Sequence, residues 1–283
     1  MQMNLTIKRI IIRLSTSLAT LLAVSLILQG CASAPIETVP EVVLRERRIQ
    51  REVTQRFEEQ LVIKDEIEVS VYLRSLALRI QSLEGQFRDL GLGVFIIQNR
   101  DLRWRNYALP GNRLYISAGL TRALTRESEV YAALAIQMAH LKKRHVVRRF
   151  GERQDDPNQV LALAQKGQIY PTLDGFLPSP MEEHPFSEEF FGPSSIFSFT
   201  EADEKEALTE AVGFLYSTGY DPRAVISLLQ IYEKSPNRAP HDPSELKKLI
   251  AHARVAVAKF PPLLNPVLNS EGYKRLESRF RQL

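Results

Sequence analysis

The stretch Glu127-Ser128-Glu129-Val130-Tyr131-Ala132-Ala133-Leu134-Ala135-Ile136-Gln137-Met138-Ala139-His140-Leu141 decides the fold of this 283-residue chain. Apolar residues recur in it at spacings of three and four, at Val130, Leu134, Met138 and Leu141. This period predicts a helix over residues 126–149 with one apolar side, capped at its start by Thr125 or Ser128. The basic residues at 142–149 suit the negative pole of a helix, which we favour over a binding patch.

The patterns on both sides of this helix predict a mainly helical α+β domain. Residues 67–83 show the helical period again, and further helices are expected at 201–217, 224–233, 244–259 and 270–281. The short apolar runs 94–97 and 114–117 favour two strands joined by a turn, because Pro110-Gly111-Asn112 lies in the polar loop between them. We expect this small sheet to pack beside the central helix.

Two other segments have less regular patterns. Residues 44–66 are dominated by Arg and Glu, which predicts a solvated helix. Residues 150–198 are rich in Pro, Gly, Phe and acidic residues and lack a period apart from one short helical stretch near residues 160–165, which predicts a long loop. Loops of that length usually cover a functional site or form an insertion.

The N-terminal residues predict export. Lys8, Arg9 and Arg13 precede an apolar run over residues 18–28, which is typical of a secretory signal peptide and too short for a membrane-spanning helix. The run ends in Leu28-Gln29-Gly30-Cys31, which resembles a bacterial lipobox. That resemblance implies cleavage of residues 1–30 and lipidation of Cys31.

The mature chain would then be a lipid-anchored protein of the outer membrane that faces the periplasm. We expect a lipidated tether at 31–43 and one domain at 44–283, held by its core alone because Cys31 is the sole cysteine. Loss of the signal peptide lowers the net charge from +4 to about +1. Such a small charge gives no reason to expect nucleic acid as a partner.

Several ordered motifs surround the central helix. Asn106-Tyr107-Ala108-Leu109-Pro110-Gly111 and Ser117-Ala118-Gly119-Leu120 precede the helix that carries His140 and His145. Glu206-Ala207-Leu208 follows, thirteen residues before Gly219-Tyr220-Asp221-Pro222. In this order the motifs resemble metallopeptidase family forty-eight, the HtpX-like, BepA-like and CAAX prenyl zinc peptidases. Glu201-Ala202-Asp203 spells the family's downstream triplet but lies five residues earlier, so it ranks second. The resemblance covers roughly residues 67–235 and implies a gluzincin-like fold.

The same resemblance assigns roles to individual residues. It implies a substrate groove formed by Asn106, Ala108, Leu109, Pro110 and Gly111. In the family, a His-Glu-x-x-His helix and a carboxylate from a later helix hold zinc, and the Glu beside the first His takes a proton from the metal-bound water.

This chain departs from the family pattern at its chemical positions. Ile136 replaces the first His and has no lone pair for a metal, so His140 and Glu206 are the residual ligand positions. Gln137 replaces the Glu base, and its amide cannot accept a proton at neutral pH. Leu208 replaces a supporting Asp. His145 lies about 500° around the helix from His140 and should point away from it, so we expect no ligand there.

These departures predict a pseudopeptidase that binds a polypeptide client or an envelope assembly partner in protein quality control, with zinc absent or weakly bound. His140 would then be a satisfied core histidine with Glu206 as its hydrogen-bond partner. One alternative is an active zinc endopeptidase with an unusual ligand set, which degrades misfolded envelope proteins. Another is a structural lipoprotein without a client, for which a filled groove would be the sign.

Overall fold

The computed structural model describes residues 39–83, 91–99, 103–155, 169–172, 175–178, 188–192 and 195–283. The predicted signal peptide and Cys31 lie outside the described residues. The chain divides into two compact units, residues 1–42 and 43–283. Within the described ranges, no helix combines the length and apolar character needed to cross a bilayer.

A four-stranded mixed sheet lies within the second unit. Its strands are β1 (Val62–Lys64), β2 (Gly93–Gln98), β3 (Tyr107–Leu109) and β4 (Arg113–Ser117), in the order β1-β2-β4-β3. The predicted strands at 94–97 and 114–117 are therefore confirmed, but the turn expected to join them is wrong. β2 and β4 are parallel, and parallel neighbours require a crossover. The crossover from β2 to β4 includes β3, which pairs with the far side of β4.

The tight turn is instead the one between β3 and β4, which pair in antiparallel fashion. Gly111 has φ 89° and Asn112 has φ 57°. Both values lie in the left-handed region, which glycine adopts freely and asparagine tolerates. The Pro110-Gly111-Asn112 signal thus marks this hairpin turn.

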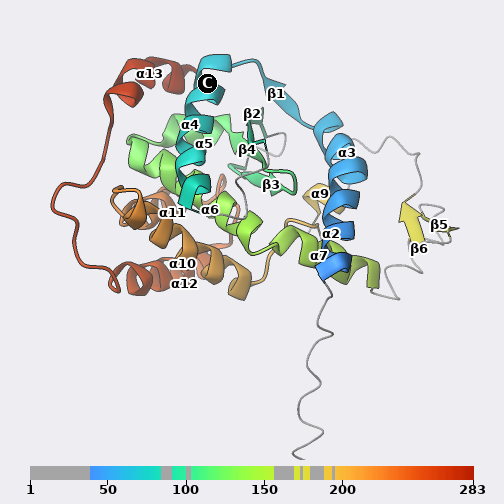
Figure 1. The fold of residues 1–283 in the computed structure, drawn as a ribbon. Coiled ribbons are helices and arrows are strands. Elements are labelled where there is room, and N and C mark those ends of the chain that lie inside the picture. The colour runs from blue at the N-terminus through green and yellow to red at the C-terminus, as the bar shows by residue number, and fades with distance from the viewer. Residues whose placement is uncertain are drawn as a thin grey trace, which may run out of the picture. The chain divides into compact units, whose positions relative to one another are not determined.

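Helices make up most of the unit. They are α4 (Ile67–Leu83), α5 (Ala118–Ala123), α6 (Glu127–Lys142), α7 (His145–Asp155), α10 (Glu201–Ser217), α11 (Ala224–Lys234), α12 (Pro243–Val257) and α13 (Glu271–Gln282). In Figure 1, α6 lies between the sheet and the helices α10, α11 and α12, and it contacts β3, β4, α10 and α11. The predicted α+β architecture, mainly helical with a small sheet beside the central helix, is confirmed.

The charged segment 44–66 is less solvated than predicted. α2 (Val39–Arg48), the π-helical turn η1 (Ile49–Val53) and α3 (Thr54–Glu59) form an almost continuous helix. Ile49, Val53 and Phe57 recur at spacings of four and are buried. The segment therefore presents an apolar stripe to the core, and β1 follows it.

The central helix is shorter than the predicted 126–149, because it breaks after Lys142. Arg144 has φ 55°, a left-handed conformation that ends a helix, and its N–H bonds to the carbonyl of Leu141 at 3.0 Å. α7 begins at the next residue, in a new direction. Neither Gly nor Pro marks the break in the sequence.

The predicted loop 150–198 contains regular structure. α7 continues to Asp155, a hairpin forms from β5 (Ile169–Thr172) and β6 (Gly175–Pro178), and α9 spans Glu188–Phe191. The predicted loop is therefore wrong for these ranges, and the short helical stretch predicted near residues 160–165 lies outside the described residues.

Glu127, the first residue of α6, joins distant segments of the fold. Its fully buried carboxylate accepts hydrogen bonds from the hydroxyls of Tyr72 on α4 (2.7 Å) and Tyr220 after α10 (2.6 Å). It also accepts from the backbone N–H of Ser270 before α13. Burial raises the pKa of both tyrosine hydroxyls, so they remain protonated donors. One side chain thus ties α4, α6 and α13 together.

We predict that Glu127→Ala lowers the free energy of unfolding by about 3 kcal/mol or more. The substitution leaves two hydroxyls and one N–H without their acceptor, at about 1–3 kcal/mol for each unsatisfied buried group. Urea denaturation of the purified chain measures the change. The control is Glu271→Ala, because the Glu271 side chain is 81% exposed and forms a surface ion pair with Lys274; the substitution should change the free energy of unfolding far less than Glu127→Ala does, because surface ion pairs contribute little. Equal stability of both variants would contradict the proposed role.

Candidate functional site

Helices α6 and α10 face one another across the predicted site. On α6, Ile136 and Gln137 are half-buried, whereas His140 is 3% exposed. α10 begins with a capping box, in which the N–H of Asp203 bonds to Thr200 Oγ1 (3.2 Å) and the N–H of Thr200 bonds to Asp203 Oδ2 (3.0 Å). This cap fixes where α10 begins.

His140 is held by protein groups on several sides. Its Nδ1 lies 2.8 Å from Nδ1 of His145, with one of the two nitrogens donating. The ring of Phe199 stacks on the His140 ring with 4.2 Å between the centroids. Nε2 of His140 lies 3.6 Å from Oε2 of Glu204. The prediction that His145 points away from His140 is wrong, because the break at Arg144 turns His145 back toward α6.

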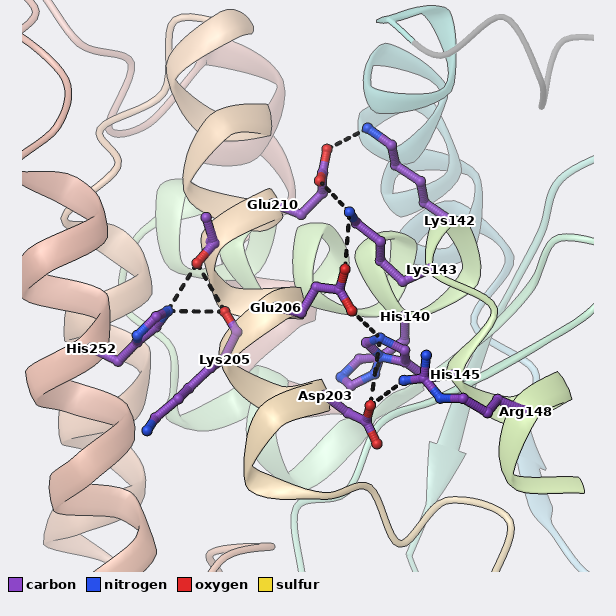
Figure 2. Close-up of polar contacts among 11 residues, drawn as sticks. His140, Lys142, Lys143, His145, Arg148, Asp203, Lys205, Glu206, Glu210 and His252 are labelled. Atoms are coloured by element: carbon purple, nitrogen blue, oxygen red, sulfur yellow. Dashed lines mark hydrogen bonds and ion pairs between the residues drawn. The ribbon is translucent and has the colours of Figure 1, made fainter. Parts of the chain in front are cut away.

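Glu206 contacts His145 and not the predicted partner His140. Its Oε2 lies 3.2 Å from Nε2 of His145, and its Oε1 lies 3.2 Å from Nζ of Lys143. Figure 2 shows Glu206 pointing toward His145, on the side where Arg148 pairs with Asp203. The Glu206 side chain is 44% exposed, so it belongs to the rim of the domain.

The carboxylate that faces His140 is Glu204, which sequence reasoning missed. Residues two apart on a helix point about 200° apart, so Glu204 and Glu206 cannot face the same way. Glu204 and Leu208 are four residues apart and share a face. The spacing could have indicated Glu204, because the family motif had already assigned Leu208 to the position of the supporting Asp.

His241 and Glu245 approach from the start of α12 and were also missed. His241 Nε2 lies 4.0 Å from Glu204 Oε2, and its Nδ1 lies 3.5 Å from Glu245 Oε2. Burial alone would raise the pKa of Glu204, but the imidazoles of His241 and His140 outweigh it and lower that pKa. Burial would lower the pKa of His241, but Glu204 and Glu245 outweigh it and raise that pKa. The charged forms of the pair stabilise one another.

A cavity of about 220 Å³ opens between these helices. Its polar lining comes from Arg105, Asn106, Gln137, Ser198, His140, Glu204, Tyr232, His241 and Glu245. Its hydrocarbon lining includes Ala133, Ile136, Leu208, Leu228, Leu229 and Leu249. Ile136 and Leu208, the two positions at which the sequence departs from the family motif by an apolar residue, thus open into one space.

The predicted substrate groove is largely covered. Of its five residues, only Asn106 lines the cavity, and its Oδ1 accepts the N–H of Ser117 at 2.9 Å. Ala108 is 2% and Leu109 0% exposed. Their neighbour Tyr107 packs against Phe57 (5.2 Å) and Phe197 (4.8 Å). Aromatic side chains therefore cover the strand that was expected to receive a peptide.

The side chains at the site do not fit a zinc ion as the family holds it. Ile136 offers no lone pair to a metal at the position of the first histidine. The side chains that face one another there are His140, Glu204 and His241, with Nε2 of His140 3.6 Å and Nε2 of His241 4.0 Å from Oε2 of Glu204. Across the residues that the structure describes, no group of three or more His, Cys, Asp or Glu side chains is arranged to hold a metal.

Comparison with known proteins gives a distant similarity. No family model matches the chain. It is 23% identical over 168 residues to the Beta-barrel assembly-enhancing proteases of Escherichia coli O157:H7, Escherichia coli strain K12 and Shigella flexneri. The match covers 56% of this chain but only 31% of each relative. The similarity supports a relationship to these proteases at the level of a family and leaves activity open.

We predict that His140 is a core residue whose loss destabilises the fold. His140→Ala removes the stacked ring and leaves Nδ1 of His145 without its partner, which should lower the free energy of unfolding by about 2–4 kcal/mol. Chemical denaturation measures this loss. His252→Ala, on the half-buried surface of α12, is the control and should cost less.

The same experiment tests for a bound metal. If His140 serves packing alone, a chelator should leave the unfolding midpoint of the unaltered chain unchanged. A chelator effect as large as that of His140→Ala would contradict the prediction, because a metal that binds the folded state adds to its stability.

Proposed function

We propose that this chain is a metallopeptidase-like protein without catalytic activity, which binds a polypeptide client or an envelope assembly partner. It would act in envelope protein quality control, exported and anchored through a lipid on Cys31, at the outer membrane and facing the periplasm. The similarity to Beta-barrel assembly-enhancing proteases supports the envelope setting.

The single observation that carries the proposal is the pair Ile136 and Gln137 at the face of α6 that opens into the cavity. Peptide hydrolysis by a zinc peptidase needs three protein ligands and a base that accepts a proton from water. By the motif resemblance, the hydrocarbon side chain of Ile136 and the neutral amide of Gln137 would stand where the family has a ligand and the base. The cavity between the helices supports a role in binding, because a filled site would leave no room for a guest.

The first test restores the missing groups. We expect the unaltered chain to bind no stoichiometric zinc and to leave casein uncut. The Ile136→His, Gln137→Glu double variant should bind zinc through residue 136, His140 and Glu204, and should then cleave casein. Metal analysis and a fluorescent casein assay provide the two measurements.

The matched control is Ile136→His alone. It restores a ligand without the base, so it should gain zinc but little cleavage. Cleavage by the unaltered chain that disappears in both His140→Ala and Glu204→Ala would contradict the proposal and favour the alternative, an active endopeptidase with an unusual ligand set.

A further inference from the structure

The cavity beside α6 has a hydrocarbon wall that crosses three further helices. Ile136 of α6 and Leu208 of α10 line it together with Leu228 and Leu229 of α11 and Leu249 of α12. A peptidase site of the family would have a histidine ligand at position 136 and a supporting aspartate at position 208. Here the same positions offer only apolar surface, whose burial against a guest is favourable by about 25 cal/mol per Å².

Gln137 supplies polar chemistry at the edge of this wall. It is half-buried, whereas the residues from Val130 to Ala135 and from Met138 to His140 are buried. No hydrogen bond joins its side chain to any other residue in the described part of the chain, although its primary amide carries two N–H donors and a carbonyl acceptor. A peptide unit offers the complementary pair, one carbonyl and one N–H.

The size and charge of the cavity restrict the guest. Ligand sites for molecules of cofactor size occupy about 300–1,000 Å³, and this cavity, at about 220 Å³, is smaller. The lining carboxylates already have imidazole partners, since Glu204 faces His140 and His241, and Glu245 faces His241. A single uncharged side chain fits these limits better than a charged group.

We propose that the decayed site is a pocket for one apolar side chain of an extended polypeptide, with Gln137 hydrogen-bonded to the peptide main chain beside it. Ile136 and Leu208 form the wall that contacts the side chain. This inference rests on the proposed binding function and names the class of client segment: extended, uncharged and with an exposed aliphatic or aromatic residue.

Binding of fluorescently labelled, unfolded casein to the full chain in lipid nanodiscs, followed by fluorescence anisotropy, tests the proposal. Ile136→Trp places a large ring in the cavity, and Gln137→Met removes the amide at similar length. Each should weaken binding at least about tenfold, as truncation of central interface residues does. A short glycine–serine peptide with a central leucine should compete with casein, and the same peptide with a central aspartate should not.

Matched controls carry the same chemical changes elsewhere. Leu78 is exposed on α4, and Gln230 lies on α11 outside the cavity lining. The variants Leu78→Trp and Gln230→Met should both bind casein as the unaltered chain does. Thermal melting shows that each variant remains folded. If Ile136→Trp unfolds the chain, the peptide pair and Gln137→Met still decide the outcome.

The possible failures are distinguishable. Absence of saturable casein binding by the unaltered chain would overturn the proposed function together with the pocket. Casein binding that neither Ile136→Trp nor Gln137→Met weakens would overturn the pocket alone. Loss of binding in Ile136→Trp without any effect of Gln137→Met would indicate an apolar guest without a main chain, such as an acyl chain, and would also overturn it.

Discussion

The enclosure of α6 in the core is the constraint on which the rest of the structure depends. The helix contacts the sheet on one side and α10 and α11 on another. The buried polar groups at its ends therefore need hydrogen-bond partners within the protein. Glu127 at its start is satisfied by Tyr72, Tyr220 and the backbone of Ser270. His140 near its end is satisfied by His145. Because the partners of Glu127 come from segments far apart in sequence, the hydrogen bonds that satisfy its carboxylate also fix where those segments lie.

The parts of the fold that could be predicted are those set by local patterns. The apolar period of α4 and the strand run of β2 depend on neighbouring residues, and both elements form where the sequence predicts them. The parallel pairing of β2 with β4 could not be predicted in this way, because register between strands is decided by contacts across the sheet. The break in the helix at Arg144 could not be predicted either, because a residue other than glycine adopts the left-handed conformation there.

The candidate site was predictable in its chemistry and less so in its geometry. Gln137 and Ile136 open into the cavity at the face of α6 that the motif predicts. Glu204 was missed because the choice between it and Glu206 depends on how α10 faces its neighbour, which the capping box at Thr200 helps to set. His241 arrives from a segment about a hundred residues beyond His140, and no local pattern indicates such a contact.

The arrangement of charges explains how the fold accommodates the buried carboxylate of Glu204. A lone ionised carboxylate in a core is costly, yet Glu204 has His140 and His241 within 4.0 Å. The two imidazoles offset that cost, and the pKa of Glu204 is lowered although burial alone would raise it. Ile136 and Leu208 line the same cavity, and as hydrocarbon they add no further polar group that would need a partner. The ionisable groups of this cavity therefore balance one another, and the helices α6, α10 and α12 are held in position by that balance.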